Sequence, residues 1–187
     1  MTVHGFVLAG GLSRRMGIDK ATVERNGRPM VVGAVEALSG CDHVTVLHRR
    51  PESLKSLFGS DVIECMSDDG GGQGPLDGLR TALHHSTSEL TVILAVDLVE
   101  SSRDLIDRLI GALRPEDVVS AAIGRSGQRQ GLVSVWRTPA ARPIVDAWFE
   151  RGERSVHRLL ETIDVRWVEV DDRSLRNVNA PSDLAEE

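Results

Sequence analysis

A glycine-rich, basic segment near the amino terminus, residues 8–20, has the sequence LAGGLSRRMGIDK and directly follows the apolar residues 3–8. We expect residues 3–8 to form a buried strand, which makes the segment a loop at that strand's carboxyl end. Gly10 and Gly11 have no side chains to hold a ligand away, so their N–H groups can point at phosphate oxygens. Arg15 can offer a planar fork, and Lys20 a point charge, to the same polyphosphate. The segment predicts a phosphate-binding loop, although a glycine turn followed by a solvated basic loop would have the same composition.

Neither standard nucleotide motif accounts for this loop. Gly10 and Gly11 are adjacent and no Gly-Lys-Ser/Thr follows them, so the segment is not a Walker A loop. The spaced glycines of a dinucleotide-binding fingerprint are missing as well.

Composition limits the classes of protein to consider. A chain of 187 residues with 41% hydrophobic content suits one soluble globular domain, residues 1–187. The net charge of −6 argues against a general nucleic-acid or anionic-membrane surface. No apolar run is long enough to span a bilayer and no signal sequence is visible, so we expect a cytoplasmic protein. Cys41 and Cys65 are then expected to be ordinary thiols.

Apolar runs alternate with helical patterns along the chain. We expect strands at residues 3–8, 44–47, 61–63, 90–96, 117–123, 132–136 and 165–170. Helical patterns begin near residues 29, 51, 75, 102, 139 and 153, and residues 21–24 are expected to be extended. This alternation predicts a three-layer α/β/α domain with a mostly parallel central sheet, a Rossmann-like arrangement that binds ligands at the carboxyl ends of its strands.

Two further features fall at such positions. Residues 67–76, SDDGGGQGPL, form a glycine-rich loop that ends where Pro75 can take the first helical position, although a mobile connector would have a similar composition. Asp97 follows the apolar residues 90–96, where a carboxylate is suited to holding Mg²⁺ against a triphosphate. An aspartate after a strand is also a common helix or turn cap.

Four strings of the sequence resemble one family. Residues 8–20 are similar to the signature loop of the nucleotidyltransferases that include molybdenum cofactor guanylyltransferase. Further similarities are Gly74-Pro75-Leu76-x-Gly78-Leu79, Gly152-x-Arg154-Ser155-Val156 and Asn177-x-Asn179-Ala180-Pro181-x-Asp183-Leu184. Through these four strings the resemblance extends over residues 3–186. The resemblance implies a nucleotidyltransferase fold and an enzyme that joins GMP from GTP to the terminal phosphate of molybdopterin and releases pyrophosphate.

The resemblance also implies roles for particular residues. The catalytic residues would be Arg15 and Lys20, acting on the triphosphate and the leaving group, and Asp97, the ligand of Mg²⁺. The nucleotide would be bound by Leu8, Ala9, Gly10, Gly11, Lys20, Pro75, Leu76 and Asp97, with Asp68 as a ribose or base contact. The second substrate would meet Arg125, Arg129, Asn177 and Asn179, although solvated hairpin arginines are the alternative for the first two.

The chain departs from the family pattern at several positions. Val99 stands in place of a proline after Asp97, Asp77 in place of a small residue, and Ala180 in place of a threonine, while a proline expected near Gly131 is missing. Leu47-His48-Arg49 occupies the region where the family often has an asparagine. A molybdenum cofactor cytidylyltransferase, another small-molecule nucleotidyltransferase, and a non-catalytic carrier of the cofactor therefore remain alternatives.

Expected partners are GTP, molybdopterin, and molybdoenzyme apoproteins or other cofactor-biosynthesis proteins. We expect no nucleic acid and no membrane as partners, and a monomer.

Overall fold

The computed structural model describes residues 1–10, 19–58, 63–67, 74–98 and 100–178. The strands in this part of the chain are β1 (Val3–Leu8), β2 (Glu24–Arg25), β3 (Arg28–Pro29), β4 (His43–Leu47), β5 (Glu64–Met66), β6 (Leu90–Ala95), β7 (Val119–Gly124), β8 (Arg129–Arg137) and β9 (Arg166–Val170). The α-helices are α1 (Met30–Ala37), α2 (Pro75–His85), α3 (Arg103–Ala112), α4 (Thr138–Glu150) and α5 (Val156–Leu160). Short 3₁₀ turns are η1 (Lys20–Thr22), η2 (Pro51–Ser53), η3 (Lys55–Leu57) and η4 (Asp172–Leu175).

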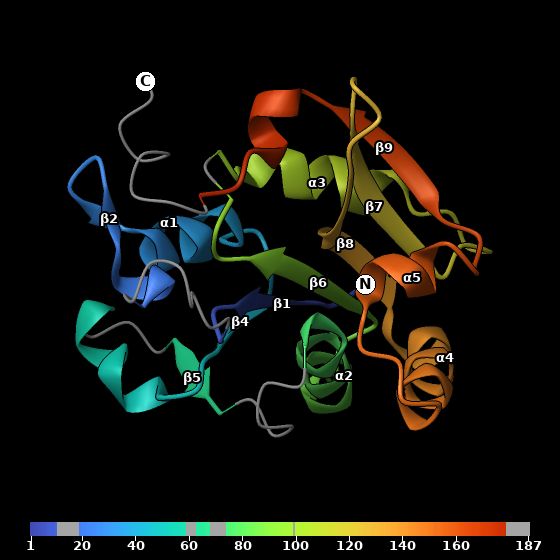
Figure 1. Ribbon diagram of the computed structural model, residues 1–187, viewed down its shortest axis with the longest axis horizontal. Helices are drawn as coiled ribbons and strands as arrows, with labels where there is room; N and C mark the ends of the chain where they lie inside the picture. The colour runs from blue at the N-terminus through green and yellow to red at the C-terminus, as the bar shows by residue number, and fades with distance from the viewer. Residues whose placement is uncertain (11–18, 59–62, 68–73, 99, 179–187) are drawn as a thin grey trace.

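The main sheet has the strand order β5-β4-β1-β6-β8-β7-β9 (Figure 1). The pairs β5/β4, β4/β1, β1/β6 and β7/β9 are parallel, while β8 runs antiparallel to both of its neighbours. The predicted mostly parallel sheet is thus confirmed. Residues 90–96 were expected to form a central parallel strand, and β6 is central, although it is parallel only to β1.

Helices cover both faces of this sheet because side chains alternate along its strands. On β1, Val3 and Val7 point into a core beneath α1 and α3, whereas Phe6 points into a second core beneath α2, α4 and α5. The near-continuous burial of β1 and β6 follows from this sandwiching, since a strand with helices on both sides has no solvent face. The predicted three-layer α/β/α architecture is therefore confirmed.

Several local predictions need correction. Residues 21–24 were expected to be extended, but Lys20–Thr22 form the 3₁₀ turn η1, because the Asp19 side chain caps the Ala21 amide. Asn26 and Gly27 form the turn between β2 and β3, and both residues have positive φ. The helix expected from Pro29 to Gly40 covers only Met30–Ala37, because Pro29 pairs in β3.

The third strand was also misplaced. It was expected at residues 61–63, but β5 covers Glu64–Met66, residue 63 lies outside it, and residues 61 and 62 are outside the described part of the chain. Pairing with Thr45–Leu47 of β4 sets this register, which a short apolar run cannot reveal. The helix expected over residues 51–58 is two separate 3₁₀ turns.

Other predictions concern single side chains. Trp136 is completely buried, as expected for a core residue, but Trp148 and Trp167 are only half-buried against the same core. Cys41 and Cys65 are free thiols, as predicted. In the part of the chain that the structure describes, none of the helices is long and apolar enough to cross a membrane.

Candidate functional site

The carboxyl ends of β1, β4 and β6 form one edge of the sheet, and the predicted phosphate loop begins there. The chain leaves β1 through Ala9, whose N–H donates to the Leu47 carbonyl of β4 at 2.9 Å. On the other side of β1, the Val96 N–H donates to the Leu8 carbonyl at 3.1 Å. Leu8 pairs with Leu47 and Ala95, the last residues of β4 and β6, so the three strands end level with one another and the loop starts between the two neighbours of β1.

The structure brings Lys20 and Asp97 together across this edge. Lys20 Nζ lies 3.0 Å from Asp97 Oδ2, although 77 positions separate the two residues in the sequence. Their side chains are 14% and 23% exposed, so the pair is sheltered but reachable. β6 places Asp97 at its carboxyl end, as predicted, while η1 places Lys20 opposite it.

Asp19 and His48 complete this arrangement, and the motifs did not assign either of them a role. Asp19 Oδ1 accepts a hydrogen bond from the Ala21 N–H at 3.1 Å, which makes Asp19 the cap of η1. Its other carboxylate oxygen, Oδ2, lies 2.9 Å from His48 Nε2. An aspartate one residue before a helical turn is a recognisable capping signal. The sequence marked Leu47-His48-Arg49 only as a departure from the family pattern and did not indicate this contact, because the contact depends on where β4 ends.

The second predicted motif forms the start of α2. Gly74 has φ +122°, a conformation that favours glycine, and a Cβ at this position would lie 3.1 Å from the Arg154 carbonyl oxygen. That same oxygen accepts a hydrogen bond from the Leu76 N–H at 3.1 Å. This hydrogen bond joins the string at residues 152–156 to the string at residues 74–79.

Gly78 allows α2 to lie close to β1. A Cβ at Gly78 would lie 3.3 Å from the terminal carbons of Leu8. Leu76 and Ala9 are buried, whereas Leu8 is half-buried and Pro75 is exposed. Of these four predicted nucleotide-pocket residues, only Leu8 and Pro75 present side chains that a ligand at this edge could contact directly.

Asp77 is buried in the first turn of α2, with 2% of its surface exposed. A carboxylate at this position interacts favourably with the positive end of the helix dipole. The departure from the family pattern at Asp77 therefore suits the start of α2.

The carboxyl-terminal segment crosses the edge next to Asp97. The Val178 N–H donates to the Asp97 carbonyl at 2.8 Å, and Asn177 forms an isolated antiparallel bridge with Leu98. Asn177 Oδ1 accepts a hydrogen bond from Gln130 Nε2 at 3.2 Å. The predicted second-substrate residue Asn177 thus lies beside the predicted metal ligand.

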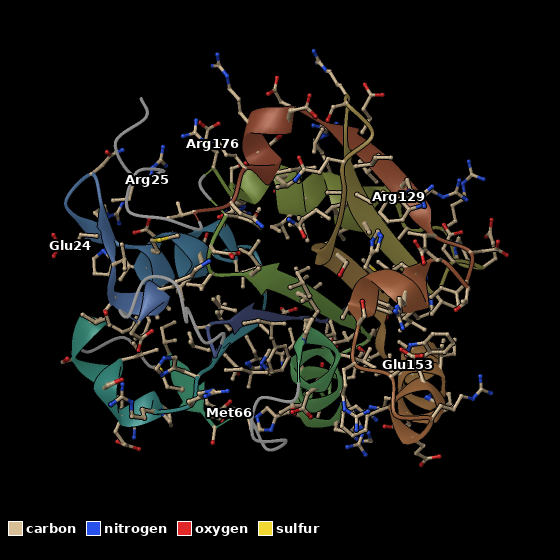
Figure 2. All side chains as sticks on the ribbon, viewed as in Figure 1. Glu24, Arg25, Met66, Arg129, Glu153 and Arg176 are labelled. Atoms are coloured by element: carbon tan, nitrogen blue, oxygen red, sulfur yellow. The ribbon has the colours of Figure 1, made fainter. Side chains whose placement is uncertain are left out.

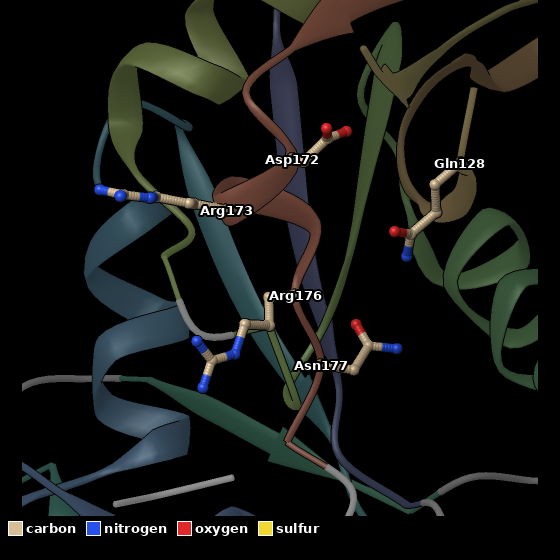
Figure 3. Close-up of a pocket in the computed structure, with 5 residues that line it drawn as sticks. All are labelled: Gln128, Asp172, Arg173, Arg176 and Asn177. Carbon is tan, nitrogen blue, oxygen red and sulfur yellow. The ribbon is translucent and has the colours of Figure 1, made fainter. Parts of the chain in front are cut away.

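A cavity of about 420 Å³ lies next to Asn177 (Figure 3). Its other lining residues are Gln128, Asp172, Arg173 and Arg176. Figure 3 shows Gln128 directed from the β7–β8 hairpin toward Asn177, while Arg173 and Arg176 extend to the other side of the carboxyl-terminal segment.

The two hairpin arginines that were assigned to the second substrate have partners on β9. The Arg129 guanidinium lies 5.0 Å from the centre of the Trp167 ring, and Arg125 Nε lies 3.9 Å from a Glu169 oxygen. Figure 2 shows Arg129 beside β9, apart from Arg176. The structure therefore places Arg125 and Arg129 on the β9 side, and Asn177 beside Asp97.

Some predicted residues lie outside the described part of the chain. These are Gly11, Arg15, Asp68 and Asn179, together with the departures at Val99 and Ala180. Gly10 is described and half-buried at the start of the loop.

Asp97 can serve as a donor to Mg²⁺. Among the described residues, no group of three or more His, Cys, Asp or Glu side chains could hold a metal ion by itself. Magnesium suits such a site, because it commonly binds one or two carboxylates and takes its other ligands from substrate phosphates and water. A half-buried carboxylate beside a phosphate loop therefore fits this ion.

Comparisons with known proteins agree with this geometry. The family model described as "MobA-like NTP transferase domain" matches residues 5–167. A protein named molybdenum cofactor guanylyltransferase from Shewanella piezotolerans is 30% identical over 83% of this chain and 76% of its own length. A probable molybdenum cofactor guanylyltransferase from Synechococcus elongatus is 33% identical over 98% of this chain and 96% of its own length.

A solved structure shares the fold at low sequence identity. The molybdopterin-guanine dinucleotide biosynthesis protein A from Archaeoglobus fulgidus has a TM-score of 0.76, with 22% identity over 97% of this chain and 95% of its own. The residues that the family model matches, 5–167, include Lys20 and Asp97 and the strands that bring them together. This chain belongs to the MobA-like NTP transferase domain family of nucleotidyltransferases.

Proposed function

We propose that this protein transfers GMP from GTP to the terminal phosphate of molybdopterin, giving molybdopterin guanine dinucleotide and pyrophosphate. The observation that carries the proposal is the meeting of Lys20 and Asp97, 3.0 Å apart, at the edge where the glycine-rich loop begins. A cation and a carboxylate at one strand end suit a reaction between two phosphorylated substrates.

The chemistry requires positioning and neutralisation of charge. A phosphate oxygen of molybdopterin attacks the α-phosphorus of GTP, the bond from the α-phosphorus to the bridging oxygen breaks, and pyrophosphate leaves. Both substrates are strongly anionic, so the site must hold them together against their repulsion. No covalent intermediate on the protein is needed.

We assign the binding of the phosphates and of the metal ion to separate residues of this chain. Lys20 provides a positive charge for the triphosphate and the leaving pyrophosphate, and we assign the same role to Arg15. The Gly10 and Gly11 amides bind phosphate oxygens. Asp97 holds Mg²⁺, which when bound neutralises phosphate charge and orients the triphosphate.

Lys20 has two uses in this scheme. In the structure it pairs with Asp97. A triphosphate entering at this edge offers Lys20 a competing set of oxygens and leaves Asp97 to the ion. The same two side chains can therefore neutralise one another and also act on the substrate.

The second substrate is assigned to the side of Asp97 where Asn177 lies. The Gln130 amide already orients the Asn177 amide at 3.2 Å, and the adjoining cavity is lined by two arginines, two amide side chains and the carboxylate of Asp172. We include Asn179 with Asn177. Arg125 and Arg129 are weaker assignments, because their partners lie on β9.

Pyrophosphate release by the purified protein tests the proposal. The reactions contain Mg²⁺, molybdopterin and one of GTP, CTP, ATP or UTP, with Asp97→Ala as the comparison. We expect release with GTP alone and its loss in Asp97→Ala, whose circular dichroism and melting temperature stay close to those of the wild type because Asp97 contributes no side chain to the core.

Other outcomes would assign a different function. Preference for CTP would indicate a cytidylyltransferase. Release with a sugar phosphate or another small acceptor, but not with molybdopterin, would indicate a different nucleotidyltransferase. Absence of release with every nucleotide, in a protein that binds molybdopterin, would support the non-catalytic carrier instead.

The remaining assignments belong to the same proposal. We propose a cytoplasmic, monomeric protein with a single domain over residues 1–187. It would deliver its product to molybdoenzyme apoproteins or to other cofactor-biosynthesis proteins.

A further inference from the structure

His48 lies beside the phosphate-binding loop, in a part of the sequence that none of the family strings covers. It directly follows β4, and only 4% of its surface is exposed. Its backbone N–H donates to the Met66 carbonyl of β5 at 3.0 Å, so the position of the residue is set by the sheet. A buried imidazole fixed at this edge requires polar partners for both ring nitrogens.

Both nitrogens have such partners, and they define one tautomer. His48 Nδ1 accepts a hydrogen bond from the Arg50 N–H at 3.1 Å, so this nitrogen carries the lone pair. The proton of the neutral ring is therefore on Nε2, which lies 2.9 Å from Asp19 Oδ2 and donates to it. The ring is held by the backbone on one side and orients a carboxylate on the other.

Asp19 transmits this orientation to Lys20. One carboxylate oxygen accepts from His48, and the other accepts from the Ala21 N–H at 3.1 Å. The two bonds fix the carboxylate at the start of η1, whose first residue is Lys20. Lys20 then meets Asp97 at 3.0 Å.

The end of β4 thus holds the chain on both sides of residues 11–18. Before them, Ala9 donates to the Leu47 carbonyl at 2.9 Å. After them, Asp19 accepts from the side chain of His48, the next residue of the same strand end. Two adjacent residues, Leu47 and His48, set the distance between the start and the finish of the phosphate loop.

We propose that His48 is a positioning residue of the nucleotidyl transfer: through Asp19 it fixes the end of the phosphate loop that places Lys20 opposite Asp97. The two ring nitrogens of His48 are already bonded to Arg50 and Asp19, so the role that we assign to it is to orient Asp19. The inference rests on the proposed role of Lys20 at the triphosphate, and it adds a specific requirement for a hydrogen-bond donor at position 48.

Three substitutions test the hydrogen bond between His48 and Asp19. His48→Phe keeps a planar ring and removes both nitrogens, whereas His48→Gln restores an N–H donor near the position of Nε2. Asp19→Asn leaves one oxygen where two are needed, so the side chain cannot accept from both His48 and Ala21. Loss of a hydrogen bond to a charged group corresponds to about 10- to 100-fold, and we expect that decrease in kcat/KM for GTP in His48→Phe and Asp19→Asn. His48→Gln should recover most of the activity.

The double variant His48→Phe/Asp19→Asn distinguishes a shared role from two separate ones. If His48 acts through Asp19, the double variant loses no more activity than the worse single variant. If the fold-losses of the two single variants multiply in the double variant, the proposal is overturned. The control is His84→Phe, which removes another histidine–aspartate contact, His84 Nε2 to Asp146 Oδ1 at 2.9 Å on α2 and α4, and should keep wild-type kinetics.

Hydrogen exchange of the Ala21 amide gives a readout that does not depend on turnover. Ala21 is completely buried, and its N–H donates to Asp19. His48→Phe should accelerate exchange at Ala21 by at least tenfold, while His84→Phe leaves it unchanged. Unchanged exchange in His48→Phe would overturn the positioning role, even if the wild type released no pyrophosphate and the proposed function failed. Should His48→Phe not fold, Asp19→Asn and His48→Gln provide the same comparison.

Discussion

Acidification should destabilise this protein between pH 7 and pH 5 through one buried histidine. His4 lies in β1 with 6% of its surface exposed, and its Nε2 shares a hydrogen bond of 2.9 Å with Thr45 Oγ1. Burial, reinforced by His43 and His85, lowers the pKa of His4 from 6.5 to about 4, although the Glu64 carboxylate acts in the opposite direction. The rings of His43 and His85 lie 5.6 and 6.2 Å away.

The sign and size of the effect follow from this pKa. The unfolded chain protonates His4 near pH 6.5 and the folded chain only near pH 4, so the folded state binds fewer protons between these values. The stabilisation from a neutral His4 is complete above pH 6.5 and is lost as the pH falls toward 4. The full loss is about 3 kcal/mol, of which about 2 kcal/mol has disappeared by pH 5. Such a loss is a large part of the 5–15 kcal/mol that is typical of a folded domain.

Urea unfolding at pH 7.5 and pH 5.0 measures this difference. Asp117, Asp146 and Glu64 have lowered pKa values, so their contributions are lost only at more acidic pH and do not obscure the result. His4→Gln can keep the hydrogen bond to Thr45 without a titrating proton. Its free energy of unfolding should therefore fall by about 2 kcal/mol less than that of the wild type between pH 7.5 and pH 5.0.

The control is His157→Gln, at an exposed position where the histidine pairs with Glu161. The free energy of unfolding of this variant should depend on pH as strongly as that of the wild type. Equal free energies of unfolding at the two pH values in the wild type, or an equal decrease in His4→Gln, would refute the reasoning.

Three further predictions concern packing, thiol reactivity and catalysis. Gly131→Ala places a Cβ 2.7 Å from Leu160 Cδ1 and should lower the free energy of unfolding, measured by urea titration, by about 1–3 kcal/mol. Gly111→Ala, in open space on α3, should instead raise it by about 0.5–1 kcal/mol. Equal effects of the two substitutions would contradict this packing. Burial raises the pKa of Cys41 to about 12, so alkylation by iodoacetamide at pH 8, followed by mass spectrometry, should be roughly a thousandfold slower than for a free thiol; a rate close to that of cysteine in solution would disprove it. Lys20→Met should lower kcat for pyrophosphate release by about 100- to 1,000-fold with little change in melting temperature, since it removes a cation from the reacting phosphates; an unchanged kcat would exclude Lys20 from catalysis.

Strand and helix alternation was readable in the sequence where a local pattern sufficed. Residues 90–96 form an unbroken apolar run, and β6 is buried at every position. Ser101 and Ser102 were both candidates for a helix cap, and in the structure it is the Ser102 hydroxyl that accepts from the Leu105 N–H. The register of β5 and the pairing of Pro29 in β3 were not readable, because they depend on partners elsewhere in the chain.

The site shows the same division. The sequence by itself determined the family, the glycine-rich loop and the position of Asp97 at a strand end, because these are properties of short contiguous strings. Tertiary structure decided which residues meet: Lys20 with Asp97, Arg154 with Leu76, and His48 with Asp19. Each of these contacts joins segments separated by 29 to 78 positions, and strand order and register alone bring such segments within hydrogen-bond distance.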